Sequence, residues 1–139
     1  MNILGLSMMS VAIFMYGVIP LFADLNRTHA TNPKWPKHAR FHVVTQVLTT
    51  AGVAAISLVL LWSPNIERRL GVGIAAALSF VVLAAFFASA ASRSLYGGGL
   101  GDEEGGIPKI KKIDLNTLNF GTAALLLIIG WIVFSWKSA

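Results

Sequence analysis

The sequence predicts an all-α integral membrane protein, a bundle of four transmembrane helices that forms a single domain over residues 1–139. Composition gives the first indication, because 55% of the residues are hydrophobic and only 12% are charged. Soluble domains carry about twice that charged fraction, so too few polar side chains remain to cover a globule in water. The second indication is four apolar segments of roughly 20 residues or more, the length that crosses the hydrocarbon core of a bilayer.

The segments between the predicted spans contain residues that stop helices. Asn32-Pro33 and Trp35-Pro36 separate the first two spans, because proline disfavours a helical conformation at the residue before it. Ser63-Pro64-Asn65 forms a short connection after the second span, so the second and third spans are expected to be antiparallel neighbours. A glycine-rich and charged segment precedes the fourth span. The predicted spans cover about residues 3–23, 37–62, 70–93 and 115–136.

The second span has a stripe of polar residues at spacings of three and four, which place them on one helix face. Polar groups in a membrane normally face the bundle interior, because exposing them to lipid is costly. We expect the stripe to line a small cavity that holds a lipid headgroup or a small amphiphile; hydrogen bonding between helices is the alternative. The predicted cavity residues are Thr45, Gln46, Thr49, Arg93, Asn116 and Asn119.

The three histidines of the chain, His29, His38 and His42, lie in one short window that Asp24 precedes. His38 and His42 are four residues apart on the expected helix, so both imidazoles can reach one metal ion. With His29 and Asp24 they would supply three nitrogens and one oxygen, a ligand set that suits zinc, iron or copper. The alternative is structural: these side chains hydrogen-bond to one another and to the loop, and fix the loop on the bundle.

Basic residues are concentrated before the second and fourth spans. Around the first loop, Arg27, Lys34, Lys37 and Arg40 form a basic rim beside Trp35. We expect this rim to contact anionic lipid headgroups, with a phosphate-bearing substrate as the alternative. The positive-inside rule then places the first and third loops in the cytoplasm. Although the pI is near 10, nucleic acid is not an expected partner, because the basic residues lie in loops beside apolar segments.

Several chemistries lack a sequence basis. The chain has no cysteine, which excludes disulfides, thiolate metal sites and c-type haem attachment. Neither a nucleophile–base motif nor a pair of carboxylates is recognisable, so no catalytic residue is assigned. Ionisable residues are missing from the middle of the spans, where a proton relay would need them.

The stretch D-x-N-x-T-H-x-x-N-P-x-W-x-x-H-x-R-x-H, from Asp24 to His42, resembles small four-span membrane proteins of a family with no assigned function. The resemblance implies the four-span fold and no particular activity. The motifs of glutathione-using membrane enzymes and of sterol-isomerase-like proteins are not present.

Three functions are compatible with these features. The leading hypothesis is a small membrane binding or accessory protein, a homo-oligomer or a subunit of a larger membrane assembly, with a polar site at one membrane interface. The alternative is a small membrane enzyme that acts on a lipid or isoprenoid-like substrate and uses the histidines as a metal site or acid/base pair. The third is a passive channel for small solutes.

Overall fold

The computed structural model describes residues 2–101, 109–110 and 113–136, and it confirms the all-α fold. All four of its α-helices are long and apolar enough to cross a membrane, which is consistent with a multi-pass membrane protein. A 3₁₀ turn, η1, continues α3, and two two-residue strands pair antiparallel before α4. The bounds are α1 Ile3–Asp24, α2 Lys37–Trp62, α3 Arg68–Ser92, η1 Arg93–Tyr96, β1 Lys109–Ile110, β2 Ile113–Asp114 and α4 Leu115–Trp136.

The starts of α3 and α4 are fixed by acidic side chains, which satisfy backbone N–H groups that have no partner within a helix. The Glu67 carboxylate accepts hydrogen bonds from the N–H groups of Arg69 and Leu70 at 2.9 and 2.6 Å, and these bonds hold the pKa of Glu67 below its ordinary value. Asp114 accepts the N–H and the hydroxyl of Thr117, both at 2.7 Å. Partial burial raises the pKa of Asp114, but hydrogen bonds including those from Thr117 outweigh it and leave the pKa below its ordinary value.

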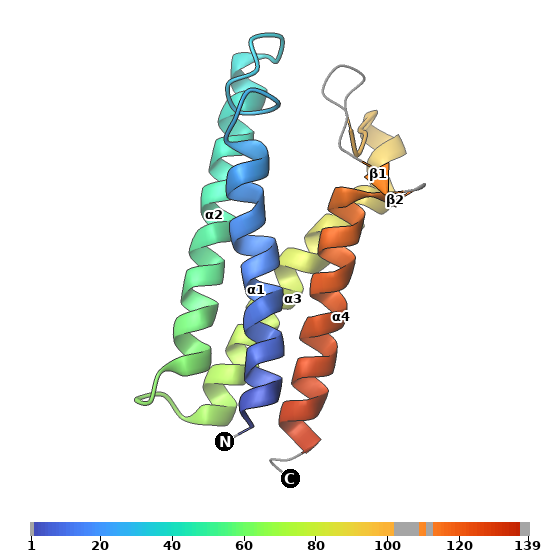
Figure 1. Cartoon of the computed structure of the whole chain (residues 1–139). Helices are drawn as coiled ribbons and strands as arrows, with labels where there is room; N and C mark the ends of the chain where they lie inside the picture. Colours follow the sequence, from blue (N-terminus) through green and yellow to red (C-terminus); the bar gives the residue numbers. More distant parts are fainter. Residues whose placement is uncertain (1, 102–108, 111–112, 137–139) are drawn as a thin grey trace.

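Helix α1 packs along both α2 and α4, and α3 crosses behind them (Figure 1). The two described ends of the chain lie at the same end of the bundle as the α2–α3 connection, which we call the closed end. Toward the other end, α1 and α2 diverge from η1 and the start of α4 (Figure 1). We call this second end the open end; it carries the loop between α1 and α2, which is loop 1.

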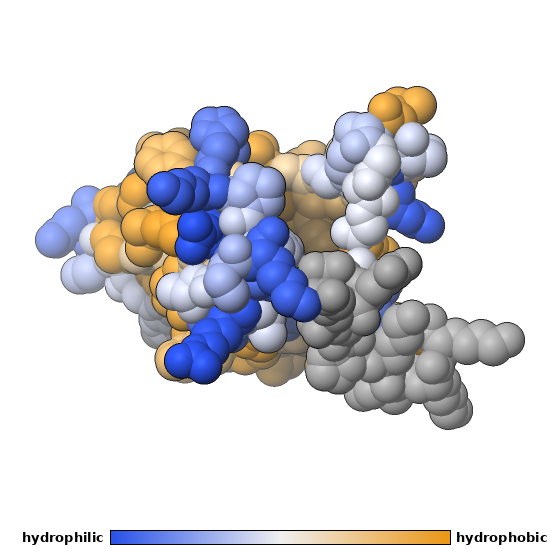
Figure 2. All heavy atoms as spheres, turned by 90° about the horizontal axis from the view of Figure 1, so that it is seen from above, coloured by the Kyte–Doolittle hydropathy of each residue, from blue (hydrophilic) through white to orange (hydrophobic). Residues whose placement is uncertain are grey.

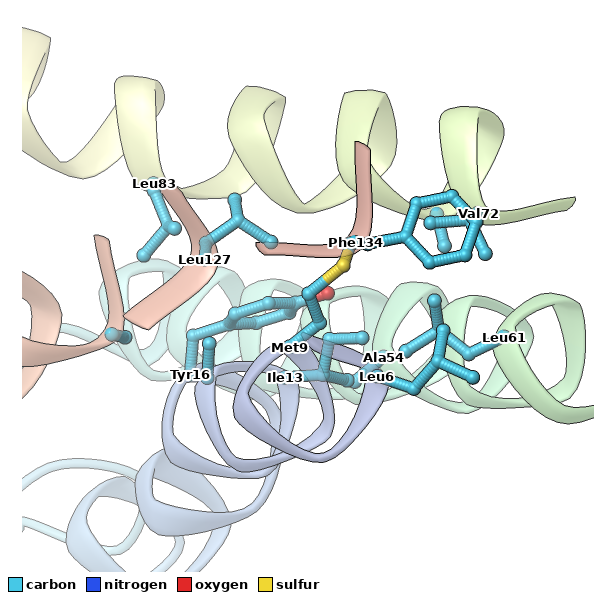
Figure 3. Packing of buried hydrophobic residues seen from close by; sticks show 13 residues of the cluster. Leu6, Met9, Ile13, Tyr16, Ala54, Leu61, Val72, Leu83, Leu127 and Phe134 are labelled. Carbon is cyan, nitrogen blue, oxygen red and sulfur yellow. The ribbon is translucent and has the colours of Figure 1, made fainter. Parts of the chain in front are cut away.

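The core is built mainly around α1, whose Leu6, Met9, Ile13 and Tyr16 are fully buried. Figure 3 shows these side chains together with buried residues of the other three helices. The hydroxyl of Tyr16 lies 3.0 Å from the Ser79 Oγ, and Ser79 donates to the Ala75 carbonyl at 2.7 Å. Tyr16 must therefore donate to Ser79, which gives a buried hydrogen bond between α1 and α3.

Two glycines allow α1 and α4 to approach closely at the closed end. A Cβ atom on Gly130 would lie 2.8 Å from the Gly5 carbonyl oxygen and 2.8 Å from the Met9 Cγ, and a Cβ on Gly5 would lie 2.7 Å from the Gly130 oxygen. Small residues at helix contacts are typical of bundles in lipid, where close packing, rather than water exclusion, holds helices together. Further along α1, a Cβ on Gly17 would clash with the Ala54 Cβ of α2.

The first prediction tests this contact with two glycines of the same helix. We expect Gly130→Ala to destabilise the bundle by about 1–3 kcal/mol, because the added methyl group overpacks the α1–α4 contact. Gly121→Ala is the control, since a Cβ there meets nothing within 4 Å, and alanine favours helix. Thermal unfolding in mild detergent measures the difference. Equal melting temperatures for the two variants would contradict the role of Gly130.

Candidate functional site

A cavity of about 830 Å³ lies between the four helices at the open end of the bundle. Its volume falls within the roughly 300–1,000 Å³ that small-molecule pockets occupy. Helices α1 to α4 all contribute to its wall, and Tyr96 of η1 adds an aromatic ring. The polar residues of the wall are Asp24, Gln46, Thr49, Thr50, Ser89, Tyr96, Asn116 and Asn119.

Along α1, α2 and α3 the wall residues nearest the open end are polar and those farther in are mainly apolar, whereas on α4 the polar Asn119 lies next to Phe120. Asp24, Tyr96 and Asn116 are at or near helix ends, whereas Val53 is about two helical turns deeper along α2 than Gln46. Deeper wall residues include Val53, Val82, Phe86 and Phe120, and the rings of Phe86 and Phe120 stack with their centroids 4.1 Å apart. Figure 2, which views the open end, shows hydrophobic surface at the bottom of a recess between paler and more hydrophilic groups. The cavity is therefore amphipathic.

Four of the six residues expected to line a cavity are in this wall: Gln46, Thr49, Asn116 and Asn119. Asn119 also donates a hydrogen bond to the Met15 carbonyl of α1 at 3.2 Å. Thr45 and Arg93 are not among the described lining residues. The guanidinium of Arg93 instead donates to the Ala90 carbonyl at 2.6 Å, where α3 ends.

Some cavity residues were not expected from the sequence. Thr50, Ser89 and Tyr96 line the cavity, and Asp24 lines it although the sequence assigned this carboxylate to a metal site. The signal for Ser89 and Tyr96 was the polar composition at the end of the third span. Composition alone does not indicate which neighbouring helix those residues face.

The histidines form two separate contacts rather than one cluster. The Nδ1 atom of His29 lies 3.7 Å from the Asp24 Oδ1 and 2.7 Å from the Thr28 Oγ1, and its ring meets Trp35 edge-on at 5.0 Å. Loop 1 thus holds His29 against the end of α1.

On α2, the Nε2 atoms of His38 and His42 lie 2.9 Å apart, and both side chains are exposed. Within residues 2–101, 109–110 and 113–136, no three histidine, aspartate or glutamate side chains form a group able to hold a metal ion. The four-ligand set Asp24, His29, His38 and His42 is therefore not assembled in this structure. The reason is that loop 1 turns His29 toward α1, while the other two histidines pair on α2.

Loop 1 is organised by its short polar side chains. Asn26 donates from Nδ2 to the carbonyls of Phe22 and Ala23 at 2.8 and 2.9 Å, and its Oδ1 accepts the N–H of Thr28 at 2.7 Å. These bonds satisfy carbonyls that the end of α1 leaves free. The stretch from Asp24 to His29 therefore has a local structural role.

The basic rim lies around this loop. Arg27, Lys34 and Lys37 are exposed, and Arg40 and Trp35 are half-buried. Figure 2 shows hydrophilic side chains over the ends of α1 and α2 at the open end. None of these five residues lines the cavity as described. The contact of the rim with lipid headgroups remains a prediction.

The fold and the cavity define a four-helix protein with an amphipathic pocket open at one end. The model of the family of unknown function DUF6640 matches residues 8–125, and the chain belongs to this family. No curated protein and no solved structure matches the chain. The matched residues include loop 1 and the whole described wall of the cavity.

The second prediction concerns loop 1. We expect Asn26→Ala to speed backbone hydrogen exchange across residues 25–35, because the variant loses the bonds to both carbonyls and to Thr28. The bundle should melt at an unchanged temperature, since Asn26 lies outside its core. Thr31→Ala is the matched control in the same loop, where the exposed side chain has no described hydrogen bond. Hydrogen exchange with mass spectrometry makes the comparison, and similar exchange in the two variants would refute this role.

Proposed function

We propose that the protein is a small membrane binding protein that holds a small amphiphile in the cavity between its four helices. The observation that carries the proposal is the cavity itself, with mainly polar side chains near its mouth and, apart from Asn119, valine and phenylalanine side chains deeper inside. An amphiphile matches this order, because its polar head would meet Gln46 and Asn116 while its chain would contact Val53 and Phe120. Ligand sites of this kind occur between the helices of bundles.

The cavity supports binding better than conduction. Toward the closed end, the fully buried Leu6, Met9 and Ile13 fill the space between the helices. Two polar side chains in this inner part, Tyr16 and Ser79, are hydrogen-bonded to each other, and Ser79 is also bonded to a carbonyl. The buried Ser57 hydroxyl has no described hydrogen-bond partner and stands alone among apolar side chains. The described residues therefore offer no continuous polar path from one end of the bundle to the other, which a channel for polar solutes requires.

Binding is also better supported than catalysis. The ionisable side chains among the described wall residues are Asp24 and Tyr96, and none of the histidines lines the cavity. A general acid or base must lie within hydrogen-bonding reach of the group that it serves. His38 and His42 contact one another on the exposed part of α2, so an acid/base role in the cavity has no geometric support.

The third prediction tests the cavity by filling it. Val53→Trp should abolish saturable labelling by a 12-carbon amphiphile that carries a diazirine in its chain, because the indole occupies the apolar part of the pocket. Val59→Trp is the control on the same helix, since Val59 is 63% exposed on the outside of the bundle. The measurement is photo-crosslinking in nanodiscs of neutral lipid, with mass spectrometry to locate the label. If probes with every headgroup tried labelled Val53→Trp as strongly as the unmodified protein, the proposed function would be refuted.

The proposed orientation places loop 1 and the segment before α4 in the cytoplasm. Basic residues support it, because they are more numerous at the open end than at the closed end, and the positive-inside rule orients such proteins. The described basic residues at the open end are Arg27, Lys34, Lys37, Arg40, Arg93 and Lys109, and those at the closed end are Arg68 and Arg69. Lys111, Lys112 and Lys137 lie outside the described residues.

The fourth prediction uses the lack of cysteine in the chain. Single variants Thr31→Cys in loop 1 and Asn65→Cys in the α2–α3 connection both introduce thiols at exposed positions. A membrane-impermeant maleimide added to intact cells should label Asn65→Cys at once, and should label Thr31→Cys only after permeabilisation. The reverse pattern would invert the orientation, and labelling of both before permeabilisation would contradict a membrane between the two ends.

A further inference from the structure

We infer that the cavity selects amphiphiles with a cationic, amine-type headgroup and that the Asp24 carboxylate recognises this charge. The inference rests on the proposed function and names its ligand class. It depends on three features of the described residues: the charges in the wall, the free hydrogen-bonding capacity of Asp24, and the chemistry of the neutral side chains around the mouth.

Asp24 is the one carboxylate in the described wall, and no lysine or arginine among the described residues accompanies it there. Arg93, the basic residue expected in the cavity, instead donates to the Ala90 carbonyl. An anionic headgroup, such as a phosphate, would therefore enter a wall that repels it and offers no cation. A cationic headgroup would meet an opposite charge in surroundings less polar than water, where charge interactions are stronger.

The Asp24 carboxylate has hydrogen-bonding capacity left for a ligand. Its side chain is 30% exposed, and its Oδ1 lies 3.7 Å from the Nδ1 of His29, beyond ordinary hydrogen-bond distance. That nitrogen is instead 2.7 Å from the Thr28 hydroxyl. No other side-chain partner of Asp24 is present in the described part of the chain. A carboxylate offers about four acceptor sites, so an ammonium group could bind without displacing loop 1.

The other polar groups at the mouth suit an ammonium headgroup as well. Gln46 and Asn116 carry amide oxygens, and Thr49 and Ser89 carry hydroxyls, all of which accept hydrogen bonds. An ammonium group donates up to three. The phenol ring of Tyr96, held by its hydrogen bond to the Ser89 carbonyl at 2.8 Å, adds an aromatic surface to the same wall. A single alkyl chain would extend over Val53 and Phe86.

The experiment compares three unlabelled amphiphiles, dodecylamine, 1-dodecanol and dodecyl phosphate, which share one chain length and differ in headgroup charge. Each displaces the diazirine probe from the full-length protein in neutral-lipid nanodiscs at pH 7. We expect dodecylamine to displace the probe at a concentration at least tenfold below that of dodecanol, with dodecyl phosphate the weakest. Asp24→Asn keeps the shape of the side chain but removes its charge. In this variant the concentrations of amine and alcohol that displace the probe should differ by no more than about threefold.

Two further variants separate charge recognition from a structural role of Asp24. Asp114→Asn removes a carboxylate near the same end but outside the described wall, and it should keep the preference for the amine. His29→Gln removes the histidine beside Asp24. If Asp24 served only to hold loop 1, both His29→Gln and Asp24→Asn would lose the preference for the amine over the alcohol. If Asp24 recognises the charge, His29→Gln should keep this preference and only Asp24→Asn should lose it.

The outcomes distinguish this inference from the proposed function. Equal displacement of the probe by the amine and the alcohol would overturn the inference, and so would an amine preference that persists in Asp24→Asn. In both cases the proposed function would still stand, provided that probe binding is saturable and is blocked by Val53→Trp. Strongest displacement by dodecyl phosphate would overturn the inference as well. A lack of saturable labelling with any headgroup would overturn both. Loss of the amine preference in Asp24→Asn alone would support the inference.

Discussion

The bundle depends on the close backbone contact between α1 and α4 at Gly5 and Gly130. In lipid, apolar helices gain little from leaving their solvent, so association requires close packing and a few hydrogen bonds. A methyl group at either glycine would meet the carbonyl oxygen of the other at less than 3 Å. This contact at the closed end brings α1 against α4, and α1 in turn contacts α2 through Gly17 and Ala54.

The cavity forms because the helices pack closely at the closed end and are farther apart at the open end. Near the closed end, fully buried Leu6, Met9 and Ile13 fill the space around α1. Near the open end, Phe86 and Phe120 stack on each other between α3 and α4, while α2 lies across the cavity from them. Hydrogen bonds between helices occur in both parts of the bundle. Tyr16 and Ser79 join α1 to α3 in the core, and Asn119 joins α4 to α1 beside the cavity.

Loop 1 holds a dense set of side-chain hydrogen bonds. Asn26 closes the end of α1, Thr28 binds His29, and His29 meets Trp35 and Asp24. These contacts order the part of the chain from Asp24 to Trp35, and they leave Asp24 at the boundary between the loop and the cavity. One residue can thus serve the loop through its backbone carbonyl, which accepts the N–H of Ala30, and the cavity through its carboxylate.

The sequence by itself determined the number of helices, their bounds to within two residues, and the polar face of α2 that supplies Gln46 and Thr49 to the cavity. These features are local, because the length of an apolar segment and a spacing of three or four residues can be counted along one helix. The tertiary structure decided which helices touch, where they diverge, and that His38 pairs with His42 while His29 lies apart beside Asp24. Contacts such as Gly5 with Gly130, or Asn119 with Met15, join residues far apart in the chain, and no local pattern specifies the register between two helices. The same reason explains why Thr45 and Arg93 were expected in the wall, whereas Tyr96 and Ser89 occupy it.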